Sequence, residues 1–184
     1  RVIYMSRWLD GVPIEGWTEE VGTIRQLDLA AGRSFTPLEV ERRQPVAILG
    51  STVVEKLFRD EPPLDRRIRV GGMHLKVIGV LADRAALAGQ QPNLRVLTPI
   101  GVVHALYGPR RSLAIPIRVA VIEDNPAVIE EITEAMRLRH RLRPDQPDDF
   151  AILTSAVLMD LWASVSRSIF TALILLVSLS LVVG

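Results

Sequence analysis

The sequence contains no cysteine among its 184 residues. That absence excludes disulfide bridges, thiolate catalysis and metal sites built on cysteine. An excess of one charge is also missing, because 22 Lys and Arg face 21 Asp and Glu and leave a formal net charge of +1. Without a basic field to hold a polyanion, nucleic acid is excluded as a partner. The length suits one hydrophobic core or two small lobes.

Leader and catalytic motifs are absent as well. The opening stretch RVIYMSRWLDG lacks the apolar region of a signal peptide. No phosphate-binding GxxxxGK[ST] loop occurs, and LGSTV lacks the second glycine of a nucleophile elbow. Because the chain begins at Arg1 and stops within an apolar run, we expect a fragment of a larger membrane protein.

The titratable residues do not form a recognisable site. His74, His104 and His140 share neither a helical face nor a metal-ligand spacing. Neighbouring carboxylates point apart on a strand and about 100° apart on a helix, so they do not pair for acid–base work. Such neighbours occur at Glu19–Glu20, Glu130–Glu131 and Asp148–Asp149. The sequence therefore predicts no catalytic residue, no metal site, no cofactor and no enzymatic activity.

One basic run, RLRHRLR (137–143), admits two interpretations. It lies at the C-terminal end of an expected helix, where cations complement the helix dipole. Asp148 and Asp149 are close enough in sequence to neutralise part of it. The alternative is a patch that binds phosphate or lipid headgroups.

Residues 168–184, SIFTALILLVSLSLVVG, carry no charge. Eleven of these seventeen residues are Leu, Ile, Val or Phe, which favours membrane insertion by about 4 to 5 kcal/mol. As a helix the segment would be about 26 Å long, slightly short of a ~30 Å hydrocarbon core. We expect residues 161–184 to begin a transmembrane helix, with Arg167 and Trp162 near the interface. The alternative is a helix buried in a soluble core.

The middle of the chain carries clear local signals. Residues 1 to about 30 read as one or two strands with loose turns. In TPLEVERRQP (36–45), Thr36, Pro37 and Glu39 predict a helix with a capping box, which Pro45 ends. VAILG (46–50) predicts a buried strand. Ser51 is expected to cap the following helix, which turns four apolar residues inward: Val53, Val54, Leu57 and Phe58.

Four further elements follow. RIRVGGMHLKVIGVLAD (67–83) predicts a hairpin turning at Gly71-Gly72. An exposed loop is expected next, and RVLTPIGVVHALYG (95–108) predicts a strand and a short helix. Residues 114–124 and 148–154 predict two strands around a helix that begins at Asn125. A last helix, 157–165, is expected to run into the apolar tail.

Read in order, these stretches resemble the extracytoplasmic core domain of MacB-like ABC transporter permeases. The resemblance rests on LAAGRSFTPLEVERRQPVAILGSTVVEKLF and PLDRRIRVGGMHLKVIGVL. Later stretches, and an apolar tail where an FtsX-like membrane part would begin, extend it. Asp65 stands where the family usually has Gly, and Arg66 where it has Lys. The family-motif residues, interpreted as structural, are Gly32, Arg33, Phe35, Thr36, Glu39, Gly50, Phe58, Pro63, Gly71, Gly79, Pro99 and Phe150.

The resemblance implies an α+β fold, with a porter-like βαβ lobe and a small β-rich lobe ahead of the transmembrane helix. It implies a core domain over 1–160, expected to lack its N-terminal part, outside the cytoplasmic (inner) membrane. It also implies a membrane part over 161–184. Its function would be non-catalytic: coupling ATP hydrolysis in the cytoplasm to export or extraction of a substrate by mechanotransmission. Residues expected inside the bilayer are Ile169, Phe170, Leu173, Leu176, Leu179 and Val182.

The implied partners are the lipid bilayer, a second permease subunit in a dimer, a cytoplasmic ATP-binding subunit or domain, and a periplasmic adaptor. Two other hypotheses remain open on the residues alone. One is an extracytoplasmic binding or adhesion domain anchored by a single C-terminal helix. The other is a membrane-bound hydrolase, which needs two titratable groups within hydrogen-bond reach in a cleft.

Overall fold

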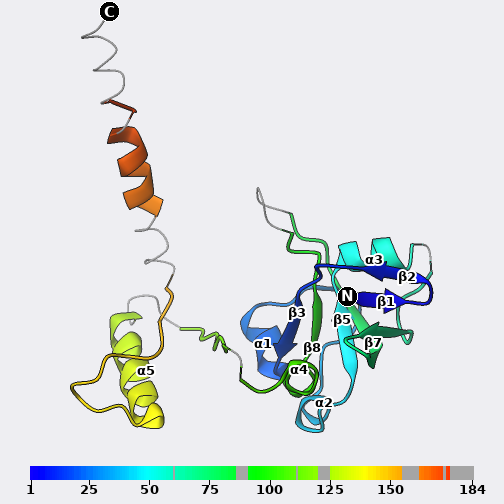
Figure 1. Cartoon of the computed structure of the whole chain (residues 1–184), viewed down its shortest axis with the longest axis horizontal. Helices are drawn as coiled ribbons and strands as arrows, with labels where there is room; N and C mark the ends of the chain where they lie inside the picture. The colour runs from blue at the N-terminus through cyan, green and yellow to red at the C-terminus, as the bar shows by residue number, and fades with distance from the viewer. Residues whose placement is uncertain are drawn as a thin grey trace, which may run out of the picture. The chain divides into compact units, whose positions relative to one another are not determined.

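The computed structural model describes residues 1–59, 61–85, 91–110, 112–119, 125–154, 162–171 and 173–174. The chain forms two compact units, Arg1–Arg118 (unit 1) and Val119–Gly184 (unit 2) (Figure 1). Unit 1 holds one mixed sheet with short helices packed on it, and the described residues of unit 2 include one long helix and a further helical stretch over 162–171. The α+β class predicted from the sequence is confirmed.

The sheet of unit 1 has the order β2-β1-β6-β7-β5-β8-β3, and β4 pairs with β7 beside this path. Its strands are β1 (Val2–Tyr4), β2 (Arg7–Leu9), β3 (Ile14–Trp17), β4 (Leu29–Gly32), β5 (Val46–Leu49), β6 (Arg67–Val70), β7 (Met73–Leu81) and β8 (Val96–Pro99). Its helices are α1 (Glu19–Ile24), α2 (Pro37–Glu41), α3 (Ser51–Leu57) and α4 (Ile100–Tyr107). The first thirty-two residues thus contain four strands and a helix, more than the expected one or two strands. Those strands have only three or four residues, too few for a clear alternation.

The longest strand, β7, organises the sheet. Its first half pairs with β6 in the predicted hairpin, which turns at Gly71 and Gly72 with positive φ angles of 55° and 91°. Its second half pairs with β4 on the same edge, and β5 runs parallel along the other edge. In the first half, exposed residues alternate with buried ones, whereas every residue from Val77 to Leu81 is buried. One face of the sheet is therefore covered at one end only.

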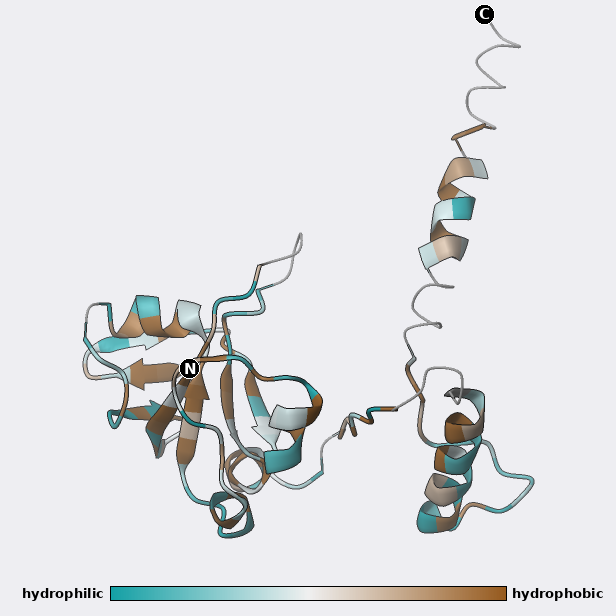
Figure 2. Ribbon diagram, turned by 180° about the vertical axis from the view of Figure 1, so that it is seen from behind, coloured by the Kyte–Doolittle hydropathy of each residue, from teal (hydrophilic) through white to brown (hydrophobic). Residues whose placement is uncertain are grey.

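Two hydrophobic clusters lie on the sheet. The larger contains Val2, Tyr4, Val12, Ala47, Leu49, Val53, Leu57, Phe58, Ile68, Val70, Leu75, Val77, Val96 and Val102. The smaller contains Trp17, Phe35, Val46, Ile48, Ile78, Leu81 and Leu97. Figure 2 shows the central strands of unit 1 coloured as hydrophobic. Phe58, fully buried, stacks on Tyr4 with ring centroids 4.1 Å apart, so α3 is fixed to the larger cluster.

The helix signals near residue 40 are confirmed, with one correction. Helix α2 begins after Thr36 with both hydrogen bonds of the capping box in place. In α3 the inward positions are confirmed, since Val53, Leu57 and Phe58 are fully buried and Val54 packs against the cluster. Ser51 does not cap α3, because Gly50 holds the cap position and the Ser51 hydroxyl donates to Asp83 Oδ1 at 2.9 Å instead.

The strand and helix predicted over 95–108 are confirmed as β8 and α4. In unit 2 the predicted helix is α5 (Asn125–His140). The strands expected beside it are absent where the structure describes them, at 114–119 and 148–154, and residues 120–124 lie outside the described residues. A strand forms only when a neighbour accepts its backbone hydrogen bonds, and neither stretch is paired with one.

The C-terminal stretch is helical over 162–171. Within the described part of the chain, no helix combines the length and apolar character needed to cross a bilayer. Half of the expected transmembrane segment, namely 161, 172 and 175–184, lies outside the described residues. So does 155–161, which holds most of the helix expected at 157–165.

Candidate functional site

Two glycines let β4 and β7 approach each other closely. Gly32 and Gly79 are paired across the strands, and the Arg33 N–H donates to the Ile78 carbonyl at 3.0 Å. A Cβ on Gly32 would lie 2.3 Å from the Ile78 carbonyl oxygen, and one on Gly79 would lie 2.7 Å from the Arg33 carbonyl oxygen. Gly32 also has a φ of +79°, which side chains rarely adopt. Only glycine fits this crossing.

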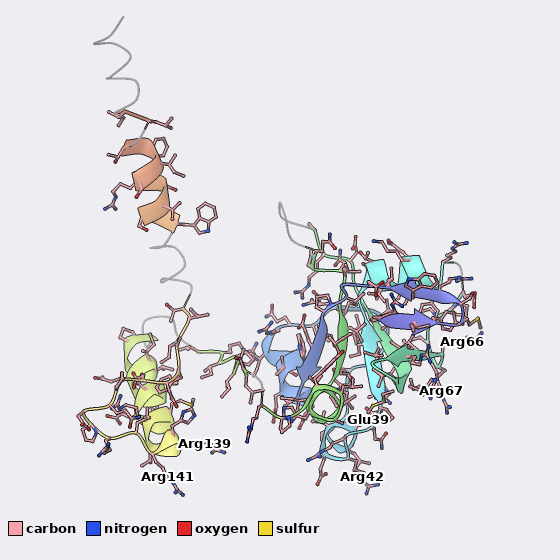
Figure 3. All side chains as sticks on the ribbon, viewed as in Figure 1. Glu39, Arg42, Arg66, Arg67, Arg139 and Arg141 are labelled. Carbon is pink, nitrogen blue, oxygen red and sulfur yellow. The ribbon has the colours of Figure 1, made fainter. Side chains whose placement is uncertain are left out.

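Beyond the crossing, Arg33 and Glu39 form a bidentate ion pair. The two guanidinium nitrogens donate to the Glu39 carboxylate at 2.8 and 2.7 Å. The Thr36 backbone N–H and hydroxyl donate to the same carboxylate at 2.9 and 3.0 Å. Glu39, labelled in Figure 3, is only 7% exposed. The carboxylate thus links the end of β4 to the first turn of α2.

This environment fixes the charge of Glu39. Hydrogen bonds from Arg33, and then from Thr36, lower the pKa of Glu39 from 4.5 to about 2, although burial opposes them. The same carboxylate raises the pKa of Arg33. A carboxylate that is ionised at ordinary pH and already accepts four hydrogen bonds does not exchange protons with a substrate. The arrangement is a structural brace, not an acid–base site.

The histidines are not brought together. His74 lies on β7, His104 on α4 and His140 at the end of α5. Within the described ranges, no three His, Asp or Glu side chains gather in a group that could hold a metal ion. Asp148 pairs with Arg137, and the Asp149 carboxylate lies 2.7 Å from Nδ1 of His140. The prediction that these two carboxylates partly neutralise the basic run is confirmed.

Sequence reasoning missed a pocket of about 500 Å³ between β3, α1, α4 and residues 112–116. Trp17, Val103 and Tyr107 contribute to its lining, and the Trp17 indole N–H donates to Glu15 at 3.0 Å. His104 also lines it, and within the described residues its buried Nε2 has no hydrogen-bond partner. Glu15, Arg25 and Ser112 also line it, so its walls mix polar and apolar side chains. Gly16 is a residue that could have indicated this close packing, because a Cβ added there would lie 3.0 Å from Ile100 and Val103. That contact depends on the tertiary fold, so the sequence alone does not predict it.

Comparison with known proteins decides the family. The MacB-like periplasmic core domain family matches residues 2–135, most of the chain. The chain belongs to this family. The resemblance inferred from the motifs is thereby confirmed.

Relatives of this MacB-like domain are named macrolide export ATP-binding/permease protein MacB. The relative from Bdellovibrio bacteriovorus is 32% identical over 155 residues, which are 83% of this chain and 24% of that protein. The relative from Chlorobaculum tepidum is 29% identical over 154 residues, 83% of this chain and 23% of that protein. The chain therefore spans about a quarter of the length of the curated relatives it matches.

Two solved structures share the fold. The periplasmic region of MacB from Actinobacillus actinomycetemcomitans aligns with a TM-score of 0.71 and 19% identity, covering 88% of this chain and 70% of that one. The extracellular domain of the ABC-type transporter YknZ, from Gram-positive bacteria, aligns with a TM-score of 0.66 and 19% identity, covering 77% and 71%. At this identity the likeness establishes the fold of the MacB-like domain.

The departure at Asp65 keeps the left-handed backbone that glycine favours. Asp65 has a φ of +62°, and its N–H donates to the Val77 carbonyl at 2.9 Å. Its carboxylate pairs with Lys76 at 2.8 Å, and that contact lowers the pKa of Asp65. Aspartate is one of the few residues that tolerate this conformation. The turn before β6 is thus held by a cross-strand ion pair and a backbone hydrogen bond.

The other motif residues are distributed through the MacB-like domain. Phe35 and Phe58 are buried in the two clusters, and Pro99 occupies the N-cap position of α4. A Cβ on Gly50 would lie 2.1 Å from the Asn93 carbonyl oxygen, so this glycine also permits a close backbone contact. Pro63 lies before β6, Gly71 in the hairpin turn and Phe150 beside His140 in unit 2. The structure brings only Gly32, Arg33, Thr36, Glu39 and Gly79 into one arrangement.

The residues expected in the bilayer divide into two sets. Ile169, Phe170 and Leu173 are described, and each is more than half exposed. Leu176, Leu179 and Val182 lie outside the described residues. Their membrane placement stays a prediction.

Proposed function

We propose that this chain is the extracytoplasmic domain of an ABC transporter permease subunit and performs no chemistry itself. The family match over residues 2–135 carries the proposal. The names of the relatives join an ATP-binding part to a permease part, and the chain corresponds to about a quarter of their length. We therefore expect ATP hydrolysis on a separate nucleotide-binding domain or subunit.

The domain would act by transmitting displacement. Unit 1 supports this role because its sheet is braced by Arg33–Glu39 and by backbone crossings that only glycine allows. Close-packed protein interiors deform little and so transmit displacement. The helix over 162–171 contains neither Gly nor Pro, the residues at which helices most often bend. Such a stretch suits mechanical coupling to a bilayer helix.

The expected setting follows from the same proposal. Residues 1 to about 160 would lie outside the cytoplasmic (inner) membrane, and 161–184 would begin the membrane part. The partners would be the bilayer, a second permease subunit, the ATP-binding part and a periplasmic adaptor. A macrolide is the first substrate to test, because the relatives are named for macrolide export.

The decisive experiment uses the full-length transporter in lipid nanodiscs. A spin label on Ser6→Cys, an exposed turn position in a chain without cysteine, reports the distance between two copies. We expect ATP to shift this distance distribution. Inserting Gly-Pro-Gly after Thr154 should abolish the shift and macrolide export while ATP hydrolysis continues.

The same insertion after Ala85, in the connection between β7 and β8, is the matched control and should change neither readout. A label that does not respond to ATP would reject mechanotransmission. A distance shift without macrolide export would reject only the substrate. A chain that never co-purifies with an ATP-binding partner would favour the anchored binding domain.

A further inference from the structure

The register of four antiparallel strands places one row of side chains across the uncovered face of the sheet. Trp8 on β2 is opposite Ile3 on β1, Ile3 is opposite Arg69 on β6, and Arg69 is opposite His74 on β7. Two residues along the hairpin, Arg67 is opposite Lys76. All these side chains are exposed except that of Ile3, which is half-buried.

This cationic face, defined as Trp8, Ile3, Arg67, Arg69, His74 and Lys76, differs sharply from the reverse side of the same strands. There Val2, Ile68, Val70 and Leu75 are fully buried in the larger cluster. The alternation is therefore complete, and the exposed positions are free of any packing demand. Nothing in the core requires arginine at 67 or 69.

The arrangement is electrostatically unfavourable in isolation. Arg67 faces Lys76 directly, and like charges opposite each other destabilise a sheet. The charge of Lys76 is partly neutralised by its ion pair with Asp65 at 2.8 Å, which reduces this repulsion. Arg67 and Arg69 have no ion pair or side-chain hydrogen bond with any residue that the structure describes. Figure 3 shows Arg67 projecting from the rim of unit 1.

Apolar surface lies next to these charges. Trp8 is 60% exposed, and the Arg1 guanidinium lies 5.9 Å from its ring centroid. Met5, in the turn between β1 and β2, is 72% exposed. Tryptophan, methionine and arginine are the residues enriched at the centres of protein–protein interfaces.

From this charge complementarity we propose that the cationic face binds an acidic segment of a partner protein. Carboxylates of that segment would pair with Arg67 and Arg69, whose forked guanidinium groups match carboxylate geometry. Its apolar side chains would cover Trp8. The row crosses three strand spacings, ~14 Å, so an extended segment of about four to six residues spans it.

A protein partner fits better than a lipid surface. Two carboxylates border the face, Asp10 paired with Arg1 and Asp65 paired with Lys76. They would oppose a uniformly anionic membrane but would help to orient a segment of defined charge pattern. The family is periplasmic, whereas the strongly negative surface that attracts basic patches belongs to the cytoplasmic leaflet.

The test is a binding measurement on this chain in a neutral detergent. A fluorescein-labelled peptide of about six residues, alternating Glu with Leu, is the probe, and its Gln–Leu counterpart is the control peptide. We expect saturable binding of the acidic peptide, measured by fluorescence anisotropy, that weakens with added salt. Arg67→Gln/Arg69→Gln should weaken it about tenfold or more.

Arg139→Gln/Arg141→Gln is the matched control, because both arginines are exposed on unit 2 and the change in net charge is identical. It should alter the affinity less than about twofold, because these arginines lie on unit 2 and are not part of the proposed binding face. Trp8→Ala should weaken binding several-fold with no change in charge. Circular dichroism and thermal unfolding establish that each variant is folded.

Three results would overturn the proposal: no saturable binding of the acidic peptide, equal weakening by both arginine pairs, or Arg67- and Arg69-dependent binding to phosphatidylglycerol vesicles alone. The proposal depends on the proposed function only for the compartment of the partner. Loss of peptide binding would leave the ATP-dependent distance shift intact. Absence of that shift would leave the peptide affinity unchanged.

Discussion

Units 1 and 2 both contain segments with regularly spaced apolar residues, but they differ in how far those side chains are buried. Every buried hydrophobic side chain among the described residues belongs to unit 1, between Val2 and Val102. In unit 2, α5 carries Val128, Ile129, Ile132 and Met136, and each is only half-buried. A helix buries its apolar stripe when a second layer covers it, and among the described residues paired strands supply that layer only in unit 1. The difference shows that an apolar pattern in the sequence predicts a helix or strand, whereas burial of its side chains depends on a second element that packs against it.

The largest effect should come from truncating leucines in the two units. Leu57 on α3 is fully buried, whereas Leu153 in unit 2 is 77% exposed. We expect Leu57→Ala to lower the free energy of unfolding of unit 1 by about 4 kcal/mol, because it leaves a cavity. Leu153→Ala should change it by less than about 0.5 kcal/mol. Urea unfolding followed by tryptophan fluorescence, to which the buried Trp17 contributes, measures both. Equal effects would remove the contrast between the units.

The next test concerns the glycine crossing that stiffens unit 1. Gly32→Ala adds a Cβ 2.3 Å from a backbone oxygen at a φ of +79°, and we expect a loss of roughly 3 kcal/mol or more. Gly11→Ala is the matched control, because Gly11 has a φ of +69° but no atom within 4 Å of the added Cβ. It should cost about 1 kcal/mol. Similar chemical denaturation midpoints for the two variants would mean that the crossing relaxes.

These tests separate what the sequence predicted from what it did not. The capping box of Thr36 and Glu39 and the turn at Gly71-Gly72 involve neighbours in sequence, so their residues predict them directly. The crossing of Gly32 with Gly79, the parallel pairing of β3 with β8 and the pocket under α4 join distant segments. No local pattern encodes them.

Wrong predictions have the same origin. The alternation of Ile115 and Ile117 is typical of a strand, yet both side chains are more than half exposed and no strand pairs with them within the described residues. Serine is a favoured N-cap residue, but the Ser51 hydroxyl donates its hydrogen bond to Asp83, thirty-two residues later. In the first case no neighbouring strand is available in the described part of the chain, and in the second a residue distant in sequence forms the hydrogen bond. Tertiary contacts therefore decided both outcomes against the local sequence pattern. The motif residues were found through resemblance, and their contacts came only with the fold.

A pH test sharpens the contrast further. The pKa of Glu39 falls from 4.5 to about 2 on folding, so its ion pair stabilises unit 1 fully above about pH 4.5 and less as the pH falls towards 2. That difference corresponds to at most about 3 kcal/mol. Glu39→Gln should therefore cost about 2 kcal/mol at neutral pH, because the amide still accepts hydrogen bonds, and almost nothing near pH 2.

Urea midpoints measured across this range provide the check, with Glu41→Gln as the control on an exposed carboxylate of the same helix. Glu41→Gln should leave the pH dependence unchanged. If Glu39→Gln lowered the free energy of unfolding by the same amount at every pH, the negative charge of Glu39 would contribute nothing to stability.

The smallest effect has the opposite sign. Because Arg67 faces Lys76, Arg67→Gln/Arg69→Gln should raise the free energy of unfolding of unit 1 by about 0.5 kcal/mol at low salt. Added salt should reduce the gain, since it screens the repulsion that the substitution removes. Arg139→Gln/Arg141→Gln, on unit 2, should leave the stability of unit 1 unchanged. If Arg67→Gln/Arg69→Gln instead lowered the stability of unit 1, these arginines would support the sheet. Their presence would then be explained by stability and would no longer point to an anionic partner.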